Sequence, residues 1–183
     1  MTGGATGIGA EVATKLAALG HEVTAFDVHE PTGVHRWIKT DLSDQSSIDA
    51  ALAQVDGPFD ALINNAGLPP RDGLEEAILL VNFFGLRAFL VGMLPKLAEG
   101  ASIVSVASRA GARWRENLDE VKAFMQIDRA ELADFIVERK ITPVRAYDLS
   151  KEAVIVLTIG RTEALFGRGP CRRRPRQPGL CSQ

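Results

Sequence analysis

Short apolar runs and helically spaced apolar residues alternate along most of this chain. Strand-like apolar runs occupy residues 21–27, 37–40, 59–63 and 101–106. Between them, apolar residues recur every three or four positions, as on one face of a helix, over residues 10–19, 44–55 and 77–97. Ser43 is the expected N-cap of the second helix. Continuous apolar strands are typical of parallel sheets covered on both faces, so the pattern predicts an α/β domain.

The pattern changes after about residue 112. Residues 113–146 carry two short amphipathic helical patterns, and Asp128 and Glu131 have the spacing of a capping box before the second. We interpret this segment as a helical insertion that forms either a substrate lid or a subunit interface. A further helix carries Tyr147 and Lys151. Residues 170–183 are rich in arginine and proline, and we expect them to be disordered or foreign to the fold.

Composition narrows the class of function. The 183 residues are 46% hydrophobic and 24% charged, with a formal net charge of −2, which is ordinary for a globular domain. We expect no nucleic-acid partner, since the arginine-rich tail has no interleaved aromatic residue. No apolar run approaches the roughly 20 residues of a membrane span and no signal peptide is seen, so we expect a cytoplasmic protein without a membrane partner. Cys171 and Cys181 lie in the tail and the histidines lack ligand spacing, so no metal site is predicted.

The chain opens with the motif Thr2-Gly3-x-x-x-Gly7-x-Gly9, directly before a helix. Such glycines let the backbone turn tightly and approach a pyrophosphate, which the helix N-terminus can bind, although a plain glycine-rich turn looks similar. Asp27 ends a strand twenty residues after Gly7, close to the spacing at which a carboxylate meets an adenosine ribose. A carboxylate there repels a 2′-phosphate, so the motif favours NAD over NADP. The alternative is a surface aspartate.

Polar and small residues follow two later strands. Residues 64–67 and Ser108 lie just past strand ends, where parallel sheets bind ligands, although an Asn pair is also common in turns. Asn82 lies among apolar helical residues and needs a hydrogen-bond partner. Tyr147 and Lys151 are four residues apart and share one face of a helix. An ammonium group favours the phenolate, and a tyrosine tuned in this way can exchange a proton with an alcohol oxygen.

Taken in order, these motifs resemble the short-chain dehydrogenase/reductase family. The resemblance rests on Thr2-Gly3-x-x-x-Gly7-x-Gly9, Asp27, Asp41-Leu42, Asn64-Asn65-Ala66-Gly67, Asn82, Ser108 and Tyr147-x-x-Ser150-Lys151. It covers residues 1 to about 169, which we interpret as one domain. Tyr147 follows Ser108 by 39 positions, a long gap that resembles the branch of 3α-hydroxysteroid dehydrogenase/carbonyl reductase and coniferyl-alcohol dehydrogenase.

The resemblance implies a Rossmann-type doubly wound parallel sheet, and hydride transfer between NAD(H) and a small-molecule alcohol or ketone, with an aromatic or cyclic substrate and a homo-oligomeric enzyme. Tyr147 would be the general acid/base, and Lys151 would favour its phenolate and hold the nicotinamide ribose. Ser108 would bind the substrate oxygen, and Asn82 would support a proton-relay water. The implied cofactor-binding residues are Gly3, Thr6, Gly7, Ile8, Gly9, Asp27, Asp41, Leu42, Asn65, Ala66, Gly67, Tyr147 and Lys151.

Two departures from the family lead to a further expectation. Family members have a strand before the glycine loop, and further strands after a segment like residues 166–169. Here the chain begins at the loop, and arginine-rich sequence follows the helix of Tyr147. We therefore expect a truncated chain, frameshifted after about Gly169, that lacks its first strand and the strands after this helix. The alternative function is a non-catalytic remnant with residual nucleotide binding, since a domain's net stability is only about 5–15 kcal/mol.

Overall fold

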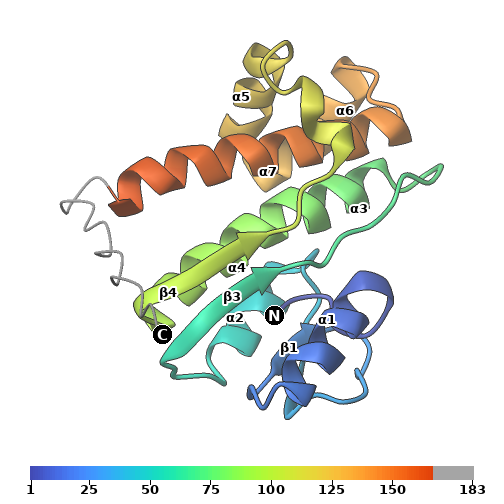
Figure 1. Cartoon of the computed structure of the whole chain (residues 1–183). Helices are drawn as coiled ribbons and strands as arrows, with labels where there is room; N and C mark the ends of the chain where they lie inside the picture. The colour runs from blue at the N-terminus through green and yellow to red at the C-terminus, as the bar shows by residue number, and fades with distance from the viewer. Residues whose placement is uncertain (167–183) are drawn as a thin grey trace, which may run out of the picture.

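The computed structural model describes residues 1–166, with side chains up to residue 160, and shows parallel strands alternating with helices (Figure 1). The strands are β1 (Thr24–Asp27), β2 (Arg36–Lys39), β3 (Phe59–Asn64) and β4 (Leu97–Ser105). The helices are α1 (Gly7–Ala18), α2 (Gln45–Leu52), α3 (Glu75–Leu79), α4 (Leu86–Met93), α5 (Leu118–Gln126), α6 (Leu132–Glu138) and α7 (Pro143–Phe166). The α/β class predicted from the hydrophobic pattern is confirmed.

Thr2 joins two pairs of strands into one parallel sheet. β1 pairs with β2 and β3 pairs with β4, both in parallel. Thr2 forms parallel bridges to Phe26 of β1 and to Asn64 of β3. The spatial order is therefore β2, β1, the Thr2 segment, β3 and β4. The described residues have no full strand before α1, as expected, yet the first residues of the chain occupy the central position of the sheet.

The two faces of the sheet bury different side chains, as a doubly wound sheet requires. Leu62 of β3 belongs to the main core, together with aromatic and aliphatic residues of α3, α4 and α7. Its neighbour Ile63 packs on a smaller cluster of Met1, Ala13 and Val23, beneath α1. Because successive residues of a strand point to opposite faces, helices must cover both sides of β3. The site is therefore built on a sheet that helices shield from both sides.

One long apolar helix forms the centre of the main core. α3 continues through a π-helical stretch, Leu80–Gly85, into α4 and a short 3₁₀ turn. The described part of the chain has this one helix that is long and apolar enough to cross a membrane, over Glu75–Lys96. The expectation that no apolar stretch is long enough for a membrane span is therefore wrong for this helix. The helix is apolar because it lies in the core: Ile78, Phe83 and Phe89 are fully buried against the rest of the domain.

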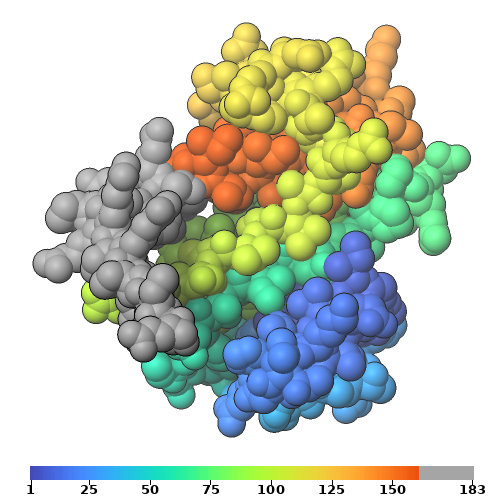
Figure 2. Space-filling model, viewed as in Figure 1, coloured from blue at the N-terminus to red at the C-terminus, as the bar shows by residue number. Residues whose placement is uncertain are grey.

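The insertion and α7 lie on the opposite side of the molecule from α1. Figure 1 shows α5 and α6 beside α7, and Figure 2 shows the insertion (yellow) and the N-terminal segment (blue) at opposite ends of one face. The capping box predicted before α6 is present, with Asp128 N donating to Glu131 Oε2 at 2.7 Å. The expectation that the chain lacks further strands after α7 concerns residues 167–183, which lie outside the described residues.

Two predicted details of the elements are wrong. Asp44, rather than Ser43, is the N-cap of α2, because its side chain accepts a hydrogen bond from Ser46 N at 2.9 Å. β4 begins at Leu97, four residues before the apolar run that predicted it, because Leu97 already pairs with Phe59. Both errors concern element ends, which depend on local hydrogen bonds rather than on the apolar pattern.

The buried amine of Met1 predicts a pH-dependent stability. It donates to Thr24 O at 2.7 Å, and burial lowers its pKa from 8.0 to about 5. The unfolded amine holds a proton below pH 8 that the folded amine has lost. This amine therefore does not lower the free energy of unfolding above pH 8. As the pH drops from 8 toward 5, the free energy of unfolding falls, by roughly 4 kcal/mol in all.

The control is a chain preceded by Val-Ile, in which a peptide bond replaces the amine. Thermal unfolding of both chains at pH 6 and pH 8.5 should show the extended chain to be more stable, with the larger difference at pH 6. An equal difference at the two pH values would contradict the assignment.

Candidate active site

A cavity of about 790 Å³ lies at the carboxyl edge of the sheet, lined by loops that follow the strands and by α7. Most of the residues singled out in the sequence line it. They are Gly3, Thr6, Gly7, Ile8, Asp27, Asp41, Leu42, Asn65, Ala66, Gly67, Ser108, Tyr147 and Lys151. Gly9 and Asn82 are not among the lining residues. The topology thus brings together positions that lie up to about 150 residues apart in the chain.

The glycine loop forms one wall because its backbone packs too closely for side chains. Gly3 has a φ of +69°, and a Cβ there would lie 2.6 Å from Ala66 Cα. A Cβ on Gly9 would lie 1.7 Å from Gly3 O, so Gly9 shapes the loop from behind the cavity wall. Thr6, the N-cap of α1, makes no side-chain hydrogen bond to the first turn. The N–H groups of that turn are of the kind that binds a phosphate.

Two carboxylates are fixed by backbone donors farther along the same edge. Asp27 accepts from Ala5 N at 3.0 Å and from His29 N at 3.0 Å. Asp41 accepts from Ser43 N at 2.8 Å and from Ser43 Oγ at 2.6 Å. Each carboxylate oxygen can accept more than one hydrogen bond, so these groups retain acceptor capacity for hydroxyl groups of a ligand.

Ser108, Tyr147 and Lys151 line the same cavity. Lys151 is 4% exposed; its Nζ donates to Val106 O at 3.1 Å and lies 5.7 Å from the centre of the Tyr147 ring. Burial lowers the pKa of Lys151 below its ordinary value of 10.5. Ser108 caps a 3₁₀ turn and accepts from Ala110 N at 3.2 Å, which leaves its hydroxyl proton for another acceptor. A phenol, a hydroxyl and an ammonium around one cavity can bind an oxygen and move its proton.

Asn82 acts behind this group rather than in the cavity. Its Oδ1 accepts from Leu68 N at 2.7 Å, and its Nδ2 donates to Leu68 O at 3.0 Å and to Ser150 Oγ at 3.2 Å. Ser150 Oγ in turn donates to Tyr147 O at 2.7 Å. The π-helical stretch that contains Asn82 thus links the loop after β3 to the helix of Tyr147. Asn82 was also expected to support a proton-relay water, and that role stays a prediction.

Sequence reasoning missed Thr2 and Ser150 as residues that organise the site, although both lie inside its motifs. Thr2 Oγ1 accepts from Asn65 N at 3.1 Å and from Ala66 N at 3.2 Å, so it holds the loop after β3. The missed lining residues are Phe26, Val28, His29, Thr40, Ser43, Leu68, Pro69, Ala77, Val81, Val106 and Ala107. Their positions in the sequence could have identified them, because they lie at strand ends, directly after strand ends, or on the helix that follows.

The sequence matches the profile of the family described as short chain dehydrogenase over residues 1–118. It is 30% identical to coniferyl-alcohol dehydrogenase of Pseudomonas sp. strain HR199 over 98% of this chain and 71% of that protein. It is 27% identical to 3-alpha-hydroxysteroid dehydrogenase/carbonyl reductase of Comamonas testosteroni, over 98% of this chain and 70% of that protein.

A solved structure agrees with this similarity. The 3-alpha-hydroxysteroid dehydrogenase from Pseudomonas sp. B-0831, complexed with NADH, superposes with a TM-score of 0.77 and 30% identity. The match covers 92% of this chain and 66% of that chain. The present chain therefore spans about two thirds of the length of that enzyme.

The close packing of the glycine loop predicts opposite effects for two glycine-to-alanine changes. Gly9→Ala places a methyl group against Gly3 O and should cost about 1–3 kcal/mol of stability. Gly160→Ala, in helix α7, meets nothing within 4 Å and should stabilise by up to about 1 kcal/mol. Urea unfolding of both variants measures the effects, and a Gly9→Ala chain as stable as Gly160→Ala would refute this description of the loop.

Proposed function

This chain belongs to the short-chain dehydrogenase family, and on that premise we propose that it transfers a hydride between NAD(H) and an alcohol or ketone with an aromatic or cyclic carbon skeleton. The proposal rests on the set of residues that line one cavity. Its lining includes both the glycine loop with Asp27 and the group formed by Ser108, Tyr147 and Lys151. A dinucleotide and a reacting alcohol can therefore lie in continuous space.

The residues present fit a dinucleotide. The glycine loop presents backbone where a Cβ would collide, and the free N-terminus of α1 suits a pyrophosphate. Asp27 and Asp41 offer carboxylate oxygens to ribose hydroxyls and to an adenine amino group. Asn65 holds the glycine loop in place, because its Nδ2 donates to Gly3 O at 2.7 Å. NAD bound here would supply the acceptor of the hydride.

The remaining chemistry belongs to the chain's own side chains. Ser108 donates its hydroxyl proton to the substrate oxygen and orients it. The Tyr147 phenolate takes the hydroxyl proton of the alcohol as the C–H hydride leaves and the C–O bond becomes a carbonyl. The ammonium of Lys151 stabilises the phenolate, and the low polarity around the buried lysine strengthens that attraction. In the reverse direction Tyr147 returns the proton to the forming alkoxide.

Apolar residues on the cavity wall support the substrate class. Leu68, Pro69, Ala77, Val81 and Ala107 line the cavity that also contains Tyr147 and Ser108. Such a wall favours hydrocarbon over charged or sugar-like groups. Three similar proteins are named for ring-bearing substrates, as coniferyl-alcohol, 3-alpha-hydroxysteroid and trans-4-hydroxycyclohexanecarboxylate dehydrogenases, and another is named for the polyol D-threitol. We extend the proposal to a cytoplasmic homo-oligomer with one domain over residues 1–169, in which 113–146 is an insertion.

A second candidate is a chain that binds NAD without turnover. It is supported by the share of its relatives that this chain spans, which is 71% of the coniferyl-alcohol dehydrogenase and 66% of the 3-alpha-hydroxysteroid dehydrogenase chain. The two candidates make different predictions for wild-type turnover and the same prediction for NADH binding.

Replacing the phenol separates binding from chemistry. Tyr147→Phe removes the proton-transferring oxygen, so kcat should fall by about 10²–10⁴-fold, while the Kd for NADH changes little. Asp148→Asn, the adjacent position on α7, is the matched control and should retain activity. A Tyr147→Phe enzyme with wild-type kcat would exclude this residue as the acid/base.

The charge of Asp27 should set the choice of cofactor. Asp27→Asn keeps the shape and one acceptor oxygen, removes the charge that repels a 2′-phosphate, and gives up one of the two backbone hydrogen bonds that Asp27 accepts. NADH should bind about tenfold more weakly, as expected for the loss of a charge-assisted hydrogen bond, and NADPH should bind more tightly. Fluorescence titration with both cofactors measures the change, with Asp60→Asn as control. Unchanged preference would remove Asp27 from the cofactor site.

A further inference from the structure

Glu152 is a buried carboxylate that the proposed chemistry does not use. It is 1% exposed and directly follows Lys151 on α7. Its Oε1 accepts from Asn117 Nδ2 at 2.6 Å and its Oε2 from Arg145 Nη2 at 2.8 Å. A buried carboxylate without such donors would be strongly unfavourable, so these two hydrogen bonds compensate for its removal from water.

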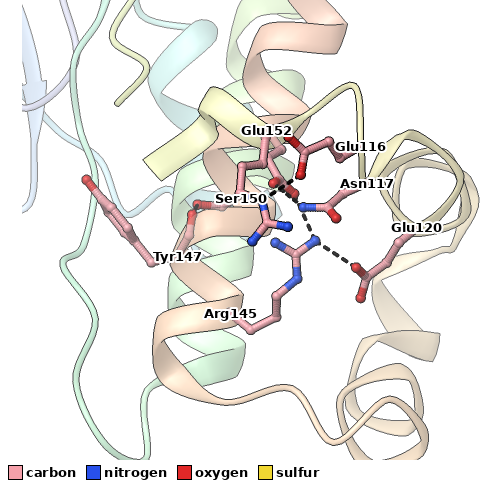
Figure 3. Close-up of polar contacts among 8 residues, drawn as sticks. Glu116, Asn117, Glu120, Arg145, Tyr147, Ser150 and Glu152 are labelled. Atoms are coloured by element: carbon pink, nitrogen blue, oxygen red, sulfur yellow. Dashed lines mark hydrogen bonds and ion pairs between the residues drawn. The ribbon is translucent and has the colours of Figure 1, made fainter. Parts of the chain in front are cut away.

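Arg145 connects the network to α5. Its Nη2 also donates to Glu120 Oε2 of α5 at 2.7 Å. Asn117 immediately precedes α5 and Glu120 lies within it, whereas Arg145 and Glu152 lie on α7, whose first residues, 143–146, end the insertion. Figure 3 shows the side chains of Arg145 and Glu152 converging on those of Asn117 and Glu120 between the two elements.

The network spans the two helical turns that carry the proposed catalytic residues. Arg145 and Glu152 are seven positions apart and share one face of α7, since a helix has 3.6 residues per turn. Tyr147 and Lys151 lie between them in sequence and fall on the opposite face. Figure 3 shows Tyr147 directed away from the network. Asn82 holds α7 on the side of Ser150, and the network holds α7 on the side of Arg145 and Glu152.

We propose that Glu152 and Arg145 are positioning residues that, with Asn117 and Glu120, clamp α7 to the insertion and thereby set the positions of Tyr147 and Lys151 in the cavity. The inference rests on the proposed function and adds a role for the insertion. A buried ion pair contributes little net stability compared with apolar residues of similar size. What an ion pair with fixed hydrogen-bond directions supplies, and apolar contacts do not, is one defined orientation of the helix.

The test compares two single variants with their combination. Arg145→Met leaves the buried Glu152 carboxylate without its charged partner, and Glu152→Met leaves the partly exposed Arg145 paired with Glu120 alone. The melting temperature of both variants should therefore fall, and more for Arg145→Met. Their kcat should fall about tenfold or more, because displaced catalytic groups lose rate steeply. The double variant removes both charges and should recover the melting temperature. Its kcat should remain low with a nearly unchanged Kd for NADH, because the directional contacts are gone.

A double variant with both wild-type stability and wild-type kcat would overturn the proposal, since the network would then be only a structural contact. The matched control is the Arg113–Glu116 pair, which lies next to the network at the same 2.8 Å but is 73% and 64% exposed. Arg113→Met and Glu116→Met should leave kcat and melting temperature unchanged.

A second variant covers the case in which the double variant does not fold. Glu120 is partly exposed, at 28%, so Glu120→Ala should fold while it releases Arg145 from α5. Its kcat should fall about threefold or more, as for a small displacement of the reacting groups. A Glu120→Ala enzyme with wild-type kcat would also overturn the proposal.

Failure of the proposed function is recognised separately, on the wild-type chain, as NADH binding without oxidation of any alcohol. The clamp is then tested by amide hydrogen–deuterium exchange over residues 145–152. Exchange should be faster in the double variant and in Glu120→Ala than in the wild type. Equal exchange rates in all three chains would overturn the clamp without reference to turnover.

Discussion

The hydrogen bonds of Thr2 and Gly3 are the constraint on which the rest of the structure depends. Thr2 N donates to Ile63 O at 2.9 Å and Gly3 N donates to Phe26 O at 3.0 Å, so these residues join β3 to β1. The Thr2 hydroxyl accepts from the loop after β3, and Asn65 returns a hydrogen bond to Gly3 O. Without this contact the sheet would separate into two pairs of strands, and the two walls of the cavity would have no fixed relation.

The other wall depends on α7, which is held from two sides. Asn82 links α7 through Ser150 to the loop after β3, and the buried carboxylate of Glu152 links it to the insertion. The glycine loop is rigid because its backbone is packed without side chains, whereas α7 is rigid because polar side chains fix its orientation. The two walls of the cavity are thus held rigid in two physically different ways. The proposed chemistry requires the distance between these walls to stay constant.

Features that depend on neighbouring residues could be predicted from the sequence, and those that depend on distant contacts could not. Apolar periodicity located the strands and helices, and the glycine spacing located the loop at Gly3, whose φ of +69° favours glycine. Asn82 was correctly expected to need a partner, but the partner is the backbone of Leu68, reached through a π-helical stretch that no pattern signals. The partners of Glu152 come from positions up to 35 residues away, so its burial could not be inferred from its own helix.

The family and the fold follow from the sequence match and from the structure, whereas turnover by this chain is the claim that most needs a direct measurement. The measurement is NADH formation by the wild-type chain with NAD and a series of cyclic and aryl secondary alcohols, after a thermal melt has shown cooperative folding. The proposed arrangement of Tyr147, Ser108 and Lys151 predicts NAD-dependent oxidation of at least one apolar ring-bearing alcohol. A cooperatively folded chain that binds NADH yet oxidises none of them would contradict it.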